Sequence, residues 1–217
     1  MARQYCSKCS KPHLACICSY LSPQDNAIAV LVLQHPDEKN KAIGTAKIVE
    51  LGLARSCVIS AITISDAYIR NKLKECACSK PLLIYPSPLN ERVSHYIHDF
   101  EKDHSIATHL KKRYDSIILL DGTWRNTREL LHCNPWLKAL STLQLVNAGE
   151  SRYRIRQAQQ AGALATVEAV SKVLVLLDQH FQSEKLLQPF EKMIEFQIKQ
   201  MGVDVYQKNY LNNKKNV

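Results

Sequence analysis

The chain has 217 residues, and 46% of them are hydrophobic, which is enough for one sizeable core and a small appended module. Its 29 lysines and arginines outnumber its 20 aspartates and glutamates, and the net charge of +9 favours a polyanionic partner, either nucleic acid or an anionic membrane surface. No stretch has the length of a membrane span and the first residues do not resemble a signal peptide, so we expect a soluble, cytoplasmic protein with no membrane partner.

The first segment of the chain is rich in cysteine and short of large apolar side chains. Because disulfides are rare in the cytosol, Cys6-x-x-Cys9 and Cys16-x-Cys18 are interpreted as four thiolate ligands for one tetrahedral metal site, and Zn²⁺ is the metal that this set favours. The alternative is four unrelated thiols in a mobile tail, with His13 as a substitute ligand. We predict a small zinc-binding module over 1–22 and a larger domain over 23–217.

Beyond this module, apolar runs alternate with segments of helical spacing. The apolar runs, typical of buried strands, lie at 27–33, 57–64, 82–85, 116–120 and 141–146. Helical spacing occurs at 42–51, 92–100, 127–131 continuing towards 140, 164–181 and 189–201. The alternation predicts an α/β domain with a mainly parallel sheet flanked by helices. None of the six glycines forms a dinucleotide-binding fingerprint or a P-loop, so these two nucleotide sites are poorly supported.

The apolar run at 116–120 ends in Asp121-Gly122-Thr123-Trp124, and a helix is expected to follow directly. Ligands of open α/β sheets bind beyond the carboxyl ends of the strands, where a carboxylate can meet a substrate. Asp121 is therefore the leading candidate for a catalytic residue. The competing interpretation is that Asp121 caps the next helix, which the spacing alone supports at least as well.

Five further motifs accompany this turn. They are Arg3-x-x-Cys6-x-x-Cys9-x-x-Pro12-x-x-x-Cys16-x-Cys18, Gln34-His35-Pro36-x-Glu38, Tyr85-Pro86-Ser87, Tyr153-Arg154-Ile155-Arg156 and Leu164-x-Thr166-x-Glu168-Ala169. In this order they resemble the DTW-domain family, whose bacterial members include tRNA-uridine aminocarboxypropyltransferases. The chain departs from the family pattern at Gly44-Thr45-Ala46-Lys47, where the family commonly has Asn-Thr-x-Arg, and at Gln157-Ala158, where a basic residue and a proline are common.

The resemblance implies a fold and a co-substrate. The DTW family is similar to the SPOUT superfamily, so the domain over 23–217 is expected to be SPOUT-like, with a C-terminal trefoil knot that holds S-adenosylmethionine. General rules make knots rare, and this expectation rests on the resemblance alone. The residues implied in holding S-adenosylmethionine are Tyr85, Pro86, Ser87, Gly122, Arg154, Thr166 and Glu168.

The resemblance also implies a reaction, the transfer of the 3-amino-3-carboxypropyl group from S-adenosylmethionine to N3 of a tRNA uridine, with the variable loop as the expected position. Uridine N3 becomes a nucleophile only as its proton leaves, so Asp121 is expected to act as the general base. Thr123 either hydrogen-bonds a substrate or caps its helix. Trp124 either stacks on a base or anchors the core.

Basic residues are expected to contact the RNA. Arg125 and Arg128 share one helix face, and the Lys111-Lys112-Arg113 run would extend the contact, although both sets also suit an ordinary solvated surface. Arg154 and Arg156 would point the same way in an extended segment and would bind either the RNA or the carboxylate of the co-substrate. Glu168 either contacts a ligand or favours the positive end of its helix.

Two other functions use the same features. One is a SPOUT-like RNA methyltransferase with the same fold and co-substrate. The other is a non-enzymatic zinc-ribbon protein that binds RNA or assists ribosome assembly, for which the charge and the cysteine module would suffice.

Overall fold

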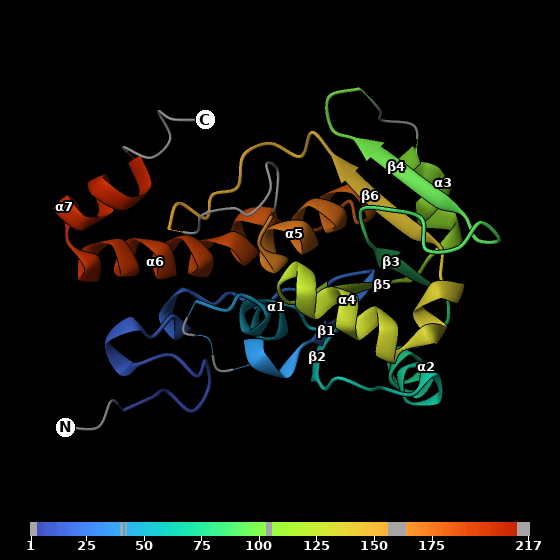
Figure 1. The fold of residues 1–217 in the computed structure, drawn as a ribbon, viewed down its shortest axis with the longest axis horizontal. Coiled ribbons are helices and arrows are strands. Elements are labelled where there is room, and N and C mark those ends of the chain that lie inside the picture. The colour runs from blue at the N-terminus through green and yellow to red at the C-terminus, as the bar shows by residue number, and fades with distance from the viewer. Residues whose placement is uncertain (1–3, 40, 42, 103–105, 156–163, 212–217) are drawn as a thin grey trace.

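The sheet at the centre of the molecule is entirely parallel (Figure 1). The computed structural model describes residues 4–39, 41, 43–102, 106–155 and 164–211. Six strands lie in the order β2-β1-β5-β3-β6-β4. They are β1 (Ala29–Gln34), β2 (Ser56–Ser60), β3 (Pro81–Ile84), β4 (His95–Asp99), β5 (Ser116–Asp121) and β6 (Thr142–Val146). The predicted parallel α/β sheet is confirmed, while the trefoil knot stays a prediction.

Helices cover both faces of this sheet. They are α1 (Ala46–Gly52), α2 (Asp66–Glu75), α3 (Ile106–Arg113), α4 (Trp124–Cys133), α5 (Thr166–Leu177), α6 (Ser183–Met201) and α7 (Val203–Tyr206), with short helical turns at His13–Ala15, Cys18–Tyr20, Pro36–Glu38, Pro135–Ala139 and Gln207–Leu211. One core cluster joins alternate sheet residues such as Val32 and Ile117 to α1, α3, α5 and α6. The other joins Leu31 and Ile118 to α2 and α4. Burial on both faces explains why the central strands are continuous apolar runs.

The helix expected at 92–100 is wrong, because this segment contains β4. Val93, Tyr96, Ile97 and Phe100 have the spacing of a helix face, yet the chain is extended and pairs with β6 from His95 to Asp99. As an edge strand, β4 is paired on one side only among the described residues, and Ile97 is 52% exposed. Because β4 is only partly buried, it lacks the continuous apolar run that marks the inner strands.

Two other helix boundaries differ from the expected ones. The helix expected at 164–181 ends at Leu177, since the next residue, Asp178, accepts hydrogen bonds from the backbone of Ala27 and His180. The last long helix starts at Ser183 and contains Pro189 in its interior, whereas the sequence suggested a start at the proline. The helices α2 and α3 were not predicted.

The cysteine-rich segment lies against α6. Cys9 and Ile17 are fully buried and belong to the same core cluster as Phe190 of α6. Figure 1 shows this segment, in dark blue, beneath the red and orange α6. A domain boundary near residue 22 stays a prediction. No helix in the described part of the chain is both long and apolar enough to cross a membrane.

All six strands run the same way, so the sheet has two chemically distinct edges. We call the edge at Gln34, Ile84 and Asp121 the carboxyl edge, and the edge at Pro81, Ser116 and Thr142 the amino edge. The carboxyl edge is the usual ligand side of such a sheet.

Candidate functional site

The four N-terminal cysteines converge on one point. Their sulfur atoms lie within 4.8 Å of one another, with Cys6 to Cys18 at 3.7 Å and Cys9 to Cys16 at 3.8 Å. Sulfurs at the corners of a tetrahedron with metal–sulfur bonds of about 2.3 Å would be roughly 3.8 Å apart. The cluster can therefore hold one metal ion, as its spacing predicted.

The surroundings of the cluster favour a thiolate at Cys6. Backbone N–H groups of Cys9 and Lys8 hydrogen-bond its sulfur and lower the pKa of Cys6 to about 6, whereas burial, followed by the neighbouring thiols, raises the pKa of Cys18 to about 12. Lys11 is buried beside Cys9, and its ammonium donates to the carbonyl of Gly44 at 2.9 Å. This positive charge partly balances a set of thiolates and ties the cluster to the loop before α1.

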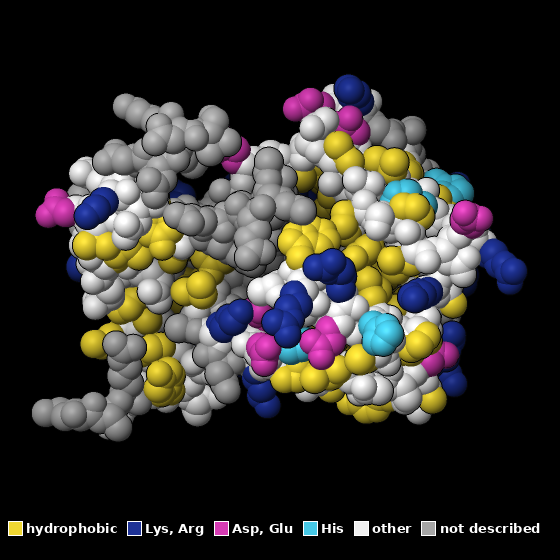
Figure 2. Space-filling view, viewed as in Figure 1, with side chains coloured by type: hydrophobic (Ala, Val, Ile, Leu, Met, Phe, Trp, Pro, Cys, Tyr) yellow, Lys and Arg dark blue, Asp and Glu magenta, His cyan; other side chains and the backbone are white. Residues whose placement is uncertain are grey.

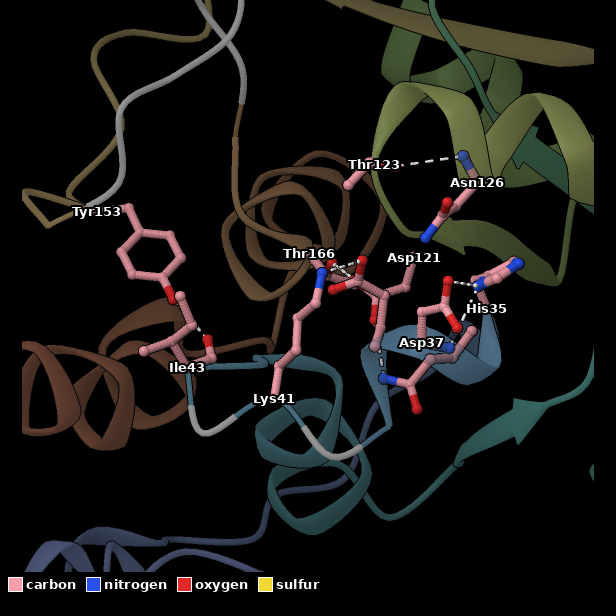
Figure 3. Close-up of polar contacts among 11 residues, drawn as sticks. His35, Asp37, Lys41, Ile43, Asp121, Thr123, Asn126, Tyr153 and Thr166 are labelled. Atoms are coloured by element: carbon pink, nitrogen blue, oxygen red, sulfur yellow. Dashed lines mark hydrogen bonds and ion pairs between the residues drawn. The ribbon is translucent and has the colours of Figure 1, made fainter.

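Asp121 ends β5 at the carboxyl edge, where both of its carboxylate oxygens accept hydrogen bonds. Gln34 of β1 donates its amide to Oδ2 at 2.8 Å, and Thr166, the first residue of α5, donates its hydroxyl to Oδ1 at 2.5 Å. Figure 3 shows the carboxylate beside the first turn of α5. These two donors come from different elements of the fold, and together they fix the orientation of the carboxylate.

The turn after Asp121 is too crowded for a side chain at Gly122. A Cβ atom there would lie 2.8 Å from Cβ of Asn126 and 3.5 Å from Cβ of His35. The backbone N–H of His35 donates to the carbonyl of Asp121 at 2.9 Å, so the two chain segments are locked together. His35 is itself buried, with Asp37 and Glu129 beside its two ring nitrogens. Close packing at Gly122 therefore fixes the backbone of Asp121.

The structure separates the roles of the residues in the Asp121 turn. Thr123 is the N-cap of α4, because its hydroxyl accepts the backbone N–H of Asn126 at 3.3 Å (Figure 3). Asp121 is therefore not the cap, and the competing interpretation of its carboxylate is wrong. Trp124 is partly exposed and belongs to neither of the two core clusters formed by the described residues. This position suits stacking better than core packing.

Glu168 is buried in the first turn of α5 and holds the loop that leads into it. Its carboxylate accepts from the hydroxyl of Ser151 at 2.6 Å, the backbone N–H of Arg152 at 2.6 Å and the backbone N–H of Ala165 at 2.8 Å. With only 4% of the residue exposed, its carboxylate supports the site through the loop.

The substitution Glu168→Gln is expected to lower the free energy of unfolding by about 1–3 kcal/mol, because the amide nitrogen cannot accept and would face a buried donor. Denaturant unfolding measures this change. The matched control is Glu195→Gln, whose carboxylate forms an exposed ion pair with Lys192 and should shift stability by less than about 1 kcal/mol. Equal losses in the two variants would contradict the role assigned to Glu168.

The segment from Tyr153 to Ile155 shows the predicted alternation. Tyr153 and Ile155 are buried, and the Tyr153 hydroxyl donates to the carbonyl of Ile43 (Figure 3). Arg154 between them is exposed, and its side chain has no hydrogen bond or ion pair with the described residues. Arg154 is thus available to a ligand, whereas Arg156 and the departure at Gln157-Ala158 lie outside the described residues.

The other departure from the family pattern lies against the start of α5. Thr45 is buried, and its hydroxyl oxygen accepts the backbone N–H of Val167 at 3.4 Å. The basic residue at the end of this motif, Lys47, forms an ion pair with Glu50 on α1. The segment thus contributes to the positioning of α5 and, through it, of Thr166.

Tyr85, Pro86 and Ser87 follow β3 at the carboxyl edge. Tyr85 is half-buried, and burial raises the pKa of its hydroxyl, although the charge of Arg128 acts in the opposite direction. Pro86 and Ser87 are exposed. The three residues therefore lie on the same edge as Asp121, with Tyr85 within electrostatic reach of α4.

The predicted RNA contacts fall at two different edges of the sheet. Arg125 and Arg128 lie exposed on α4, which begins at the carboxyl edge, and Figure 2 shows basic side chains gathered on this face. The Lys111-Lys112-Arg113 run ends α3 and precedes β5, so it lies at the amino edge. The structure does not bring these two groups together.

Two residues of the site were missing from the sequence-based candidates. Gln34 directly follows the apolar run of β1, and the same strand-end argument that selected Asp121 applies to it. His35 lies in the same motif, and the sequence alone assigns it no role in the site. Its buried ring between two carboxylates became visible only when α4 was placed beside it.

The family model described as DTW domain matches residues 3–198, and the chain therefore belongs to the DTW-domain family. It is 27% identical over 219 residues to tRNA-uridine aminocarboxypropyltransferase 2 of Drosophila melanogaster, an alignment that covers 96% of this chain and 81% of the fly protein. Proteins of the same name from Macaca fascicularis and Mus musculus are each 26% identical, over 90% and 96% of this chain and over 64% and 68% of their own lengths. No solved structure matches the chain.

Proposed function

We propose that this chain transfers the 3-amino-3-carboxypropyl group of S-adenosylmethionine to N3 of a tRNA uridine, in the cytoplasm. The observation that carries the proposal is the Asp121 carboxylate, which Gln34 and Thr166 hold at the carboxyl edge of the sheet. The names of the three relatives and the family membership point to the same reaction. The variable loop of the tRNA is the expected position.

The charges at this edge fit S-adenosylmethionine, which bears a sulfonium, an ammonium and a carboxylate. Arg154 and the amino end of α5 supply positive charge for its carboxylate. Tyr85, Pro86, Ser87, Gly122 and Thr166 would line the site, and Glu168 would support it through its loop. When bound, S-adenosylmethionine supplies an activated carbon next to its sulfonium.

Asp121 is assigned the role of general base. Each of its oxygens accepts one described hydrogen bond and retains a lone pair, so the carboxylate can still take the N3 proton. The two hydrogen bonds fix the direction of the carboxylate, and proton transfer to it depends on this alignment. Trp124 would stack on a nucleobase of the tRNA, and Thr123 keeps α4 in place as its N-cap.

The metal proposed for the cluster of Cys6, Cys9, Cys16 and Cys18 is Zn²⁺, because four thiolates in a compact tetrahedral arrangement are typical of structural zinc sites. These ligands leave no open position for a substrate. Zinc therefore stabilises the N-terminal segment and takes no part in the transfer.

Labelled co-substrate distinguishes the proposed reaction from methylation. With bulk tRNA, label in the carboxyl group of S-adenosylmethionine is expected to enter the RNA and methylthioadenosine to appear, while label in the methyl group stays out. Methyl label in the RNA, together with S-adenosylhomocysteine, would instead show a methyltransferase. A third outcome is a chain that binds RNA, does not bind S-adenosylmethionine and transfers no label to the RNA. A non-enzymatic RNA-binding role would then replace this proposal.

A further inference from the structure

A second basic site lies at the amino edge of the sheet, away from Asp121. A shallow hollow of about 540 Å³ is lined by Lys80, His109, Lys112, Arg113, Tyr114 and Ser141. Lys80 and Ser141 directly precede β3 and β6, Tyr114 lies just before β5, and the other three belong to α3. Parallel strands thus bring residues from three connections to one place.

The hollow carries positive charge without a described counterion. Lys80, Lys112 and Arg113 are exposed and form no ion pair with any residue that the structure describes. The neighbouring carboxylate of Asp115 accepts the backbone N–H groups of Ser79 and Lys80, each at 2.9 Å, and the hydroxyl of Ser116. Asp115 is thereby occupied by its own loop, and the three cations remain available to an anionic ligand.

Two of the lining residues, Tyr114 and Ser141, carry hydroxyl groups. The Tyr114 hydroxyl donates to that of Tyr96 at 3.3 Å. Burial would raise the pKa of Tyr96, but hydrogen bonds with Ser94 and Tyr114 and the nearby charge of Arg113 outweigh it and lower this pKa. The guanidinium of Arg113 therefore lies near these hydroxyl groups. Together with Lys80 and Lys112 it forms a set of charged donors that is typical of a phosphate site.

We propose that this hollow binds backbone phosphates of the tRNA at a distance from the nucleotide that is modified. The proposal rests on the proposed function for the identity of the RNA. Six residues of β5 separate the two edges, which corresponds to about 16–20 Å. A nucleotide at Asp121 cannot reach the hollow, whereas a folded RNA can span both edges. The lysine and arginine side chains around the hollow fit a phosphodiester that enters between them better than a flat layer of lipid headgroups.

The test compares two variants that lose the same charge. The hollow variant carries Lys80→Gln, Lys112→Gln and Arg113→Gln. The control carries Lys185→Gln, Lys199→Gln and Lys208→Gln, three exposed lysines without a described ion pair, in α6 and the turn that follows α7. Figure 1 shows α6 at the opposite end of the molecule from α3. Thermal melts establish that both variants are folded.

Binding of full-length tRNA is measured as a function of salt. The hollow variant is expected to bind about tenfold or more weakly near physiological salt and to lose about 2–3 units of salt slope, since each phosphate contact contributes about 0.9. Its turnover at saturating tRNA and its affinity for a short stem-loop that contains the target uridine should match the wild type. The control should retain affinity and slope.

Several outcomes would overturn the proposal. They are an unchanged salt slope in the hollow variant, an equal loss in the control, and a loss that is as large for the stem-loop as for the full tRNA. Weaker binding to phosphatidylserine vesicles with unchanged tRNA binding would assign the hollow to a membrane surface. If the wild type neither binds nor modifies tRNA, the proposed function itself fails, and this result is distinct from the others.

Discussion

Replacing Asp121 by Asn is expected to reduce turnover by roughly a hundredfold or more, while the protein stays folded and binds both substrates. The Asn amide can accept from Gln34 through its oxygen and donate to the Thr166 hydroxyl, which is free to rotate. The hydrogen bonds that position the side chain are therefore preserved, and only the capacity to accept the N3 proton is lost. Single-turnover product formation at saturating substrates measures the effect.

The matched control for this experiment is Asp115→Asn, which removes a carboxylate directly before the amino end of the same strand. The Asp115 carboxylate accepts hydrogen bonds from the backbone of Ser79 and Lys80. The change is therefore expected to lower stability but to leave the rate of product formation by the folded protein nearly unchanged. A near-normal rate in Asp121→Asn would exclude Asp121 as the base. A lost rate together with lost S-adenosylmethionine binding would make Asp121 a ligand-binding residue.

The second large effect is expected at the cysteine cluster. Cys6→Ser combined with Cys9→Ser should lower the zinc content from about one ion per chain to nearly none. It should also cost stability on the order of 3 kcal/mol or more, a fraction of the about 10–16 kcal/mol that zinc supplies in isolated zinc-finger peptides. The loss should reach the whole fold because Cys9 is fully buried in the main core cluster with Ile17. Metal analysis and thermal melts of the purified protein are the measurements.

The matched control replaces two thiols that lie outside the cluster, Cys57 in β2 and Cys133 at the end of α4. The variant with Cys57→Ser and Cys133→Ser should retain its zinc. The assignment fails if wild-type protein purified without chelator contains no zinc, or if the metal content is unchanged after both ligands are replaced.

Five of the six strands could be predicted because they contain apolar runs. In β1 and β5 this pattern follows from burial on both faces of the sheet. The edge strand β2 has an apolar run although its residues are only half-buried. The edge strand β4 is only partly buried, and its apolar residues have the spacing of a helix face instead of a continuous run. In α3 only Leu110 is buried, and a single apolar position does not give the periodic pattern by which a helix is recognised.

Two parts of the candidate site could be predicted from the sequence, namely the residue at the end of a strand and the cysteine cluster. The position of Asp121 follows from the end of an apolar run, and the thiol cluster follows from spacing within thirteen residues. The bond from Thr166 to Asp121 joins positions 45 residues apart and depends on how α5 packs on the sheet. Likewise, the assignment of Lys111, Lys112 and Arg113 to the amino edge needed the position of α3, which the sequence did not reveal.

The order of the strands has a consequence for synthesis on the ribosome. Strand β1 pairs with β2 on one side and with β5 on the other, and its last residue meets Asp121, 87 positions later in the chain. At about 5–20 residues per second, translation takes roughly 4–17 seconds to supply that partner. During this interval one side of an apolar strand has no permanent neighbour, which is the situation in which nascent chains aggregate. A nascent chain truncated before β5 should therefore associate with holdase chaperones, and one that extends past α5 should be released from them.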